Sequence, residues 1–167
     1  MSSVGQIHLI RTALAADIPQ VREMLQEYVA WIGLDLAFQE IDDELAGLPG
    51  DYAPPRGALL VAAEGTVLVG MIALRPIDDR ICEMKRLFVR PQARGRGLAR
   101  KLVDGILSEA RRLKYDEIRL DTLPMMGDAQ NLYVAMGFAD IDAYYETPIA
   151  GTRFMALRLG SGQAKSL

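Results

Sequence analysis

The chain has 167 residues, one histidine, one cysteine and a formal net charge of −3. This length suits one domain with its own core, and a weakly acidic chain argues against nucleic-acid binding, which needs clustered lysine and arginine. The single cysteine, Cys82, excludes an internal disulfide, and with His8 as the single histidine we expect no metal site.

The sequence has no charged segment followed by an apolar run at its N-terminus, and no apolar run near the roughly 20 residues of a membrane span. We therefore expect a cytoplasmic protein with no membrane partner.

The first elements along the chain are a strand and two helices. Residues 7–11 alternate weakly, as in a short strand. Asp17, with Gln20 three residues later, has the pattern of a capping box that begins a helix. Its apolar positions continue to Ile32, and a second amphipathic stretch covers residues 34–48.

Three strands and a strong helix follow. Residues 58–63 and 67–74 predict a hairpin, and residues 81–89 predict a third strand that stops at a proline. After Gly97, apolar residues recur at helical spacing as far as Leu113.

The last part of the chain predicts a strand at residues 118–122 and a short helix at 129–136, ended by Gly137. Two closing strands follow at 138–141 and 153–159. This order indicates an α/β fold with a mixed sheet. We expect one domain over residues 1–160 and a flexible tail at 161–167.

The segment Gln92-Ala93-Arg94-Gly95-Arg96-Gly97 lies between a strand and a helix. Glycines let the backbone approach a ligand closely. The first N–H groups of the helix and its dipole favour phosphate, and Arg94, Arg96 and Arg100 add positive charge. A Walker loop would need Lys-Ser/Thr where Leu98-Ala99 stand, and a dinucleotide-binding fingerprint would need a small residue in place of Arg100. The sequence therefore argues against both kinds of nucleotide-binding loop.

The segment resembles the acyl-CoA signature Gln/Arg-x-x-Gly-x-Gly/Ala of the GNAT superfamily of N-acetyltransferases. Leu132-Tyr133-(x3)-Gly137-Phe138 matches a second hallmark at the expected distance, and the resemblance extends from about residue 7 to residue 159. It implies a mixed sheet of about seven strands with about four helices. It also implies that an acetyl group passes from acetyl-CoA to a primary amine in a ternary complex, without a metal.

The resemblance assigns the cofactor site residue by residue. The backbone of the strand end pairs with the pantetheine arm, and one of its N–H groups, near Leu87 or Phe88, stabilises the oxyanion. Backbone N–H groups of the loop hold the pyrophosphate. The implied cofactor-binding residues are Leu87, Phe88, Val89, Gln92, Arg94, Gly95, Arg96, Gly97, Leu98 and Ala99.

Tyr133 matches the family tyrosine that protonates the leaving thiolate. One departure concerns the position seven residues before it: many members have asparagine there, contacting the pantetheine, and here it is Met126.

The amine must lose a proton before it attacks. Glu83, six residues before Val89, is our leading candidate base. The alternatives are that Glu83 pairs with Lys85, Arg86 or a neighbouring strand, or that a water chain removes the proton. Cys82 is interpreted as a small buried hydrophobe and not as a nucleophile, because the sequence offers no suitable histidine partner to activate it.

The acceptor pocket is expected in the least patterned regions. Tyr28, Trp31, Tyr144 and Tyr145 are aromatic candidates for its lining. The acidic stretch at residues 35–44 favours a cationic amine, whereas Arg86 and Arg153 suit a substrate carboxylate, so the acceptor stays open.

A small-molecule amine is favoured as the partner, because no long extra segment is present to grip a peptide. The alternatives are a protein or peptide acceptor, or a non-catalytic acyl-CoA sensor, which would not need Glu83 or Tyr133. Dimers are common in similar proteins, so a homodimer is compatible with the sequence.

Overall fold

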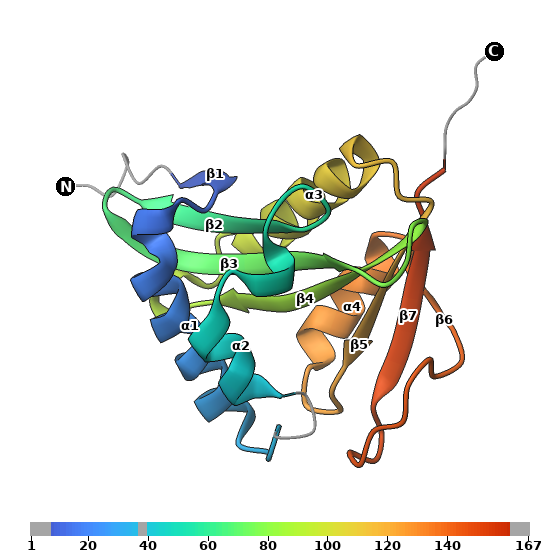
Figure 1. The fold of residues 1–167 in the computed structure, drawn as a ribbon. Helices are drawn as coiled ribbons and strands as arrows, with labels where there is room; N and C mark the ends of the chain where they lie inside the picture. Colours follow the sequence, from blue (N-terminus) through green and yellow to red (C-terminus); the bar gives the residue numbers. More distant parts are fainter. Residues whose placement is uncertain (1–7, 37–39, 161–167) are drawn as a thin grey trace.

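A computed structural model describes residues 8–36 and 40–160. Across these residues the strands form one seven-stranded sheet in the order β1-β2-β3-β4-β5-β7-β6, antiparallel except for the parallel neighbours β4 and β5 (Figure 1). The strands are β1 (Leu9–Thr12), β2 (Ala58–Glu64), β3 (Val67–Pro76), β4 (Ile81–Val89), β5 (Glu117–Thr122), β6 (Ala139–Asp140) and β7 (Arg153–Arg158).

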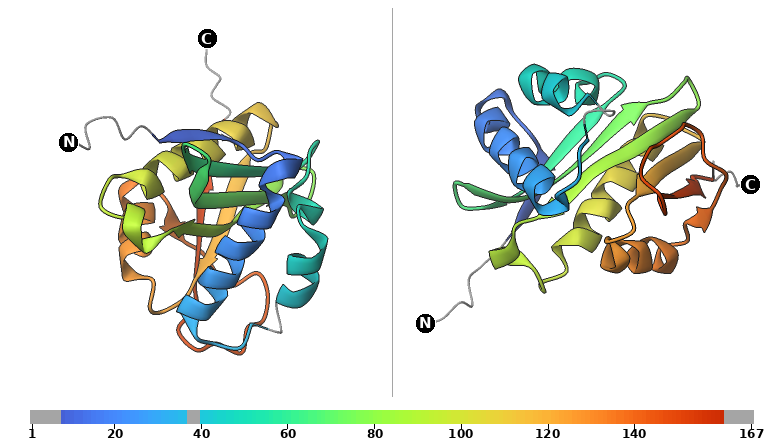
Figure 2. Two further views of the ribbon diagram at one scale, coloured as in Figure 1. Left: turned by 90° about the vertical axis from the view of Figure 1, so that its left-hand side faces the viewer. Right: turned by 90° about the horizontal axis from the view of Figure 1, so that it is seen from below.

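Helices cover both faces of the sheet (Figure 2). On one face α1 (Ile18–Ile32) and α2 (Ile41–Gly47) share a core with Phe88 of β4. On the other face α3 (Leu98–Arg112) and α4 (Gly127–Ala135) share a core with Cys82 and Met84. The long helices α1 and α3 bury their apolar stripes, and α2 and α4 each add one buried residue, so the sheet has a separate core on each side.

The fold class and element order predicted from the sequence are confirmed, and residues 81–89 form a strand as expected. The second helix is shorter than the predicted stretch of residues 34–48, since it covers only Ile41–Gly47. Residue 7 of the first predicted strand, and the predicted tail at 161–167, lie outside the described residues. In the part of the chain that is described, no helix has both the length and the apolar character to cross a membrane.

The predicted capping box at Asp17 and Gln20 is wrong. Asp17 already has helical backbone angles, because a single 3-10 turn precedes α1, and its side chain caps no N–H group of α1. The carboxylate instead accepts the N–H of Leu14 and pairs with Arg11 at 2.6 Å. The Gln20 amide bonds to the hairpin between β2 and β3, where it accepts the N–H of Leu68. Tertiary partners therefore replace the local motif.

Strands β4 and β5 part soon after they meet. They pair only from Ile81 to Glu83 on β4, so the following residues of β4 have no strand partner on that side within the described structure. A β-bulge lies just beyond, because Ile72 of β3 faces both Arg86 and Leu87, and Arg86 takes a positive φ of 63°. A bulge bends the strand that carries it, and the opening between the strands becomes the site described next.

Candidate active site

The opening between β4 and β5 is a cavity of about 580 Å³. Its walls are the end of β4, the C-terminal part of α1, the glycine loop with the start of α3, and the first turns of α4 with the loop before it. The lining residues are Trp31, Leu87, Phe88, Val89, Ala93, Arg94, Gly95, Gly97, Leu98, Ala99, Met125, Met126, Gly127, Asp128, Ala129, Leu132 and Tyr133. The free edge of β4 in this cavity offers backbone groups to which an extended ligand can bind as an added strand.

The glycine loop shows why glycine is needed at two positions. Gly95 and Gly97 have φ values of 81° and 76°, a conformation that costs other residues free energy. A Cβ atom at either position would meet no protein atom within 4 Å. The space beside the loop is therefore open to a ligand, and the backbone conformation alone requires glycine.

The N-terminus of α3 has the features of an anion site. Its N-cap residue is Gly97, which has no side chain to cap the first N–H groups, and no acidic residue lies in the first turn. The helix dipole and these N–H groups favour a negative charge here. The exposed Arg100 adds a cation in the same turn.

The predicted cofactor-binding residues all line this cavity except Gln92 and Arg96. Arg94 donates from Nε to the carbonyl of Val89 at 2.8 Å, and its guanidinium lies 5.8 Å from the ring centres of Trp31 and Phe88. Arg96 turns away and pairs with Glu64 at 3.3 Å. The contact of Gln92 and Arg96 with a cofactor stays a prediction.

Tyr133 extends from α4 into the same cavity and is only 6% exposed. Its ring packs against Phe138, and its hydroxyl forms no hydrogen bond with any residue that the structure describes. Burial, then the nearby Tyr28 and Asp121, raise the pKa of Tyr133 above its ordinary value. The hydroxyl therefore stays protonated at neutral pH, which is the form that can donate a proton.

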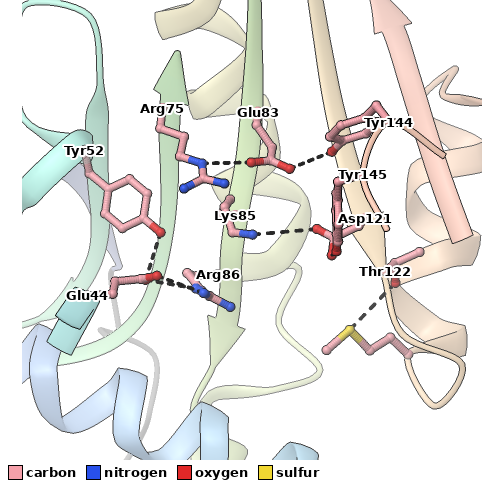
Figure 3. Close-up of polar contacts among 11 residues, drawn as sticks. Glu44, Tyr52, Arg75, Glu83, Lys85, Arg86, Asp121, Thr122, Tyr144 and Tyr145 are labelled. Carbon is pink, nitrogen blue, oxygen red and sulfur yellow. Dashed lines mark hydrogen bonds and ion pairs between the residues drawn. The ribbon is translucent and has the colours of Figure 1, made fainter. Parts of the chain in front are cut away.

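A second cavity of about 420 Å³ lies further back along β4. Glu83, Lys85 and Arg86 line it, whereas Leu87, the next residue, lines the first cavity, so one strand passes from one cavity to the other. Figure 3 shows the side chains that β3, β4 and β5 direct into this region. The full lining is Glu40, Asp51, Arg75, Pro76, Ile77, Glu83, Lys85, Arg86, Tyr144, Tyr145 and Glu146.

Glu83, the predicted base, is almost completely buried, and both of its oxygens accept hydrogen bonds (Figure 3). Arg75 donates from Nε to Oε1 at 2.8 Å, and the Tyr144 hydroxyl donates to Oε2 at 2.6 Å. The ion pair with a neighbouring strand, one alternative weighed from the sequence, is thus present through Arg75 of β3. The catalytic role of Glu83 stays a prediction.

Lys85 lies beside Glu83, and its amine points toward β5. Its Nζ is 3.8 Å from Oδ1 of Asp121, while the Tyr145 hydroxyl donates to Oδ2 of the same carboxylate. Burial lowers the pKa of Lys85; Asp121 and Glu83 oppose this effect, and the cations Arg86 and Arg75 reinforce it.

The predicted substrate-binding residues fall into two groups. Tyr144 and Arg86 line the second cavity, as does Tyr145, and the two tyrosine rings pack on Phe154 at 5.2 and 5.1 Å. Arg86 is bound by Glu44, and its guanidinium lies 5.7 Å from the ring centre of Tyr28.

The other predicted substrate residues lie elsewhere. Tyr28 is buried below Arg86 and lines neither cavity. Arg153 pairs with Asp140 at 2.5 Å, outside the linings of both cavities. Trp31 lines the first cavity and not the second.

Sequence reasoning missed Arg75 and Asp121, and it included Glu44 only as one acid of the stretch at residues 35–44, without its pairing with Arg86. A usable signal existed for Lys85 and Asp121, because charged residues interrupt strands that are otherwise largely apolar. Arg75 and Glu44 carried no such signal, since an arginine near a strand end and an acid on a short helix are ordinary surface residues. Met126 lines the first cavity where many family members have asparagine, and its sulfur accepts the Thr122 hydroxyl at 3.7 Å.

The sheet of this α/β protein parts between its two parallel strands, and a glycine loop and an uncapped helix N-terminus lie at the opening. This arrangement suits a phosphorylated, extended ligand. Residues 18–138 match the acetyltransferase (GNAT) family. The chain belongs to this family, and it is an acyltransferase.

Individual relatives agree with this assignment. An uncharacterized N-acetyltransferase of Schizosaccharomyces pombe is 38% identical, over 95% of this chain and 99% of its own length. An acetyltransferase of Streptococcus agalactiae has a similar structure, with a TM-score of 0.76 and 27% identity over 90% of this chain and 98% of its own. A Salmonella typhimurium protein solved with its cofactor acetyl-CoA shares the fold, with a TM-score of 0.71 and 22% identity over 94% and 96% of the two chains.

Proposed function

We propose that this protein transfers the acetyl group of acetyl-CoA to the primary amine of a small molecule bound in the second cavity. The observation that carries the proposal is the course of β4, which passes directly from the second cavity at Arg86 to the first cavity at Leu87. An acceptor in one cavity and a thioester in the other would then meet beside the same strand. This arrangement supports direct attack in a ternary complex.

The first cavity fits acetyl-CoA in three respects. The free edge of β4 at Leu87–Val89 can pair with the pantetheine amides. The loop at Gly95 and Gly97 leaves open space beside the backbone, and the start of α3 offers uncapped N–H groups to the pyrophosphate. The acetyl-CoA bound to the Salmonella typhimurium protein of the same fold supports this choice of ligand.

Acetyl-CoA supplies an activated acetyl group as a thioester. The chain supplies a backbone N–H near Leu87 or Phe88 to stabilise negative charge on the carbonyl oxygen, and the protonated Tyr133 hydroxyl to give a proton to the sulfur. Cys82 is a poor candidate for a covalent route, because burial raises the pKa of its thiol to about 12 and it packs in the core under α3.

The second cavity supports a small acceptor. Its volume of about 420 Å³ matches a metabolite rather than a folded substrate. Its lining includes three acidic side chains, Glu40, Asp51 and Glu146, which form no ion pair with any described residue. These carboxylates favour the approach of a cationic amine.

The test is a thiol-release assay with acetyl-CoA and a panel of amines, amino acids, polyamines, aminoglycosides and peptides, run with wild type and Tyr133→Phe. Acetylation of a small amine that falls sharply in the variant supports the proposal. Acetylation of peptides alone shows a peptide acceptor instead. Tight acetyl-CoA binding by calorimetry without turnover of any panel member favours the sensor.

A further inference from the structure

Lys85 has an unusual environment for a lysine. Its side chain is only 6% exposed, yet it lines the second cavity. Its Nζ forms no hydrogen bond with any residue in the described ranges, and the nearest carboxylate oxygen, on Asp121, is 3.8 Å away, beyond hydrogen-bond distance. An ammonium group carries three donors and no acceptor, so a buried ammonium without an acceptor is costly. Burial and the missing hydrogen bond therefore disfavour the charged form of Lys85 relative to that of an exposed lysine.

The carboxylates around Lys85 each accept a hydrogen bond from another side chain, so none depends on Lys85 as its donor. Glu83 of β4 accepts from Arg75 and Tyr144, and Asp121 of β5 accepts from Tyr145. On the α2 side, Glu44 accepts from Arg86 and Tyr52.

The remaining charges near Lys85 are Arg86, which follows it in β4, and Arg75 of β3, both of which oppose a further cation. Glu40, Asp51 and Glu146 line the same cavity and form no ion pair with a described residue. The overall result of burial and these charges is a pKa of Lys85 below its ordinary value, with burial as the largest cause.

This inference rests on the function proposed above. We propose that Lys85 is the group that accepts the proton from the acceptor's ammonium, at the point where the second cavity meets the first. Lys85 lies two residues before Leu87 on β4 and lines the cavity in which the acceptor would lie, with its amine directed toward Asp121 of β5. Asp121 is not part of the cavity lining, so an acceptor reaches Lys85 first.

The protons balance. The acceptor nitrogen enters as an ammonium and loses two protons on the way to an amide. One passes to Lys85, where the carboxylate of Asp121 stabilises the ammonium that forms, and is then released to solvent. Tyr133 gives its own proton to the sulfur, and the second proton from nitrogen replaces it. The carbon–sulfur bond breaks as the carbon–nitrogen bond forms, and no oxidant or further reactant is needed.

The structure favours Lys85 over Glu83 for this step. Each oxygen of Glu83 already accepts a hydrogen bond, from Arg75 or from Tyr144, and these donors favour the carboxylate without an added proton. The amine of Lys85 has no such donor in the described structure. Glu83 then serves to hold Arg75 and Tyr144 in place at the wall of the cavity.

A substrate-independent test follows, because the chain has only four lysines, Lys85, Lys101, Lys114 and Lys165. We would titrate protein labelled with ¹³C and ¹⁵N in lysine by NMR, with and without bound acetyl-CoA, and assign Lys85 by its loss in Lys85→Arg. Lys114→Arg, an exposed site outside both cavities, is the matched control. We expect Lys85 to titrate below the three other lysines. Titration together with them, or above them, would overturn the proposal.

The kinetic arm uses the amine of the panel with the highest turnover. Lys85→Met and Lys85→Arg should lower kcat by at least about 100-fold, the usual contribution of a positioned base, with acetyl-CoA affinity by calorimetry unchanged. The ascending limb of kcat against pH should persist in Glu83→Gln and disappear in both Lys85 variants. A kcat within about threefold of wild type in Lys85→Met, or an ascending limb lost only in Glu83→Gln, would contradict the role of Lys85. Failure of acetyl-CoA to bind wild type would instead overturn the proposed function, whatever the titration of Lys85.

Discussion

Arg86 of β4 and Glu44 of α2 form a buried pair with two parallel hydrogen bonds. Nε of Arg86 donates to Oε2 of Glu44 at 2.9 Å, and Nη2 donates to Oε1 at 2.8 Å (Figure 3). The two side chains are only 5% and 15% exposed. Because Arg86 is at the bulge between the two cavities, this pair attaches the bulge to α2. Tyr52 adds a third hydrogen bond, from its hydroxyl to the same carboxylate.

Removal of Glu44 should therefore be costly. Glu44→Ala removes the carboxylate that accepts two hydrogen bonds from the buried Arg86 guanidinium. We therefore expect the free energy of unfolding to fall by about 3–5 kcal/mol. Urea denaturation measures the change. Asp42→Ala, an exposed acid on the same helix, should cost less than about 0.5 kcal/mol. If the two variants lose equal stability, the pair contributes nothing beyond a surface charge.

The same pair predicts a pH dependence of stability. Burial alone would raise the pKa of Glu44, but the hydrogen bonds from Arg86 and Tyr52 outweigh it, so the pKa is lowered in the folded state. A lowered folded pKa stabilises the protein at pH above the ordinary glutamate value, and this contribution is lost as pH falls through the folded value. The stability difference between wild type and Glu44→Gln should thus be largest near neutral pH and shrink in acid. A difference that grows on acidification would contradict the assignment.

Gly57 should not tolerate even one added methyl group. A Cβ there would lie 2.3 Å from the carbonyl oxygen of Asp51 and 2.7 Å from the carbonyl carbon of Tyr52, both backbone atoms. Backbone cannot move aside as a side chain can, so Gly57→Ala should cost about 1–3 kcal/mol and lower the melting temperature. Gly47→Ala is the matched control, because its Cβ meets nothing within 4 Å and its φ is not positive. A neutral Gly57→Ala would mean that the turn at residues 50–52 relaxes freely.

The parts of the fold that were predictable are those encoded in contiguous residues. The strand at 81–89 ends before a proline and the helix begins directly after Gly97, so these two boundaries agree with the structure. The glycine loop was found for the same reason. The capping box failed because the partners of Gln20 lie in the hairpin between β2 and β3, which no local pattern reveals.

The second cavity was only partly predictable because its parts are distant in the sequence. Residues near 40–51, 75–86 and 144–146 meet there only after the sheet has formed. The bulge at Arg86 turns two successive side chains, Lys85 and Arg86, toward the same region. Strict alternation along β4 would have separated them. A sequence pattern of alternating residues therefore could not predict that Lys85 and Arg86 line the same cavity.

Tyr133→Phe should separate catalysis from binding. The Tyr133 hydroxyl has no hydrogen-bond partner in the described structure, so its removal should leave stability within about 0.5 kcal/mol and acetyl-CoA affinity unchanged, while kcat falls by about 100-fold or more. Tyr115→Phe is the matched control: its hydroxyl donates to the carbonyl of Arg56 at 2.7 Å, outside both cavities. That variant should lose about 1 kcal/mol of stability and keep its kcat. A Tyr133→Phe enzyme with normal kcat would assign the proton to another donor.

Substitution of Gly95 tests whether the glycine loop binds the phosphates of the cofactor. Gly95→Asp and the control Gly65→Asp both place a side chain at positive φ, 81° and 64°, where a Cβ meets no protein atom within 4 Å. Each should lower the free energy of unfolding by about 1 kcal/mol, since both place a residue with a Cβ atom in the left-handed region. Only Gly95→Asp places a negative charge in the first cavity, so only it should weaken acetyl-CoA binding, by at least about tenfold by calorimetry. If Gly95→Asp binds acetyl-CoA as tightly as Gly65→Asp does, the phosphates do not lie at the start of α3.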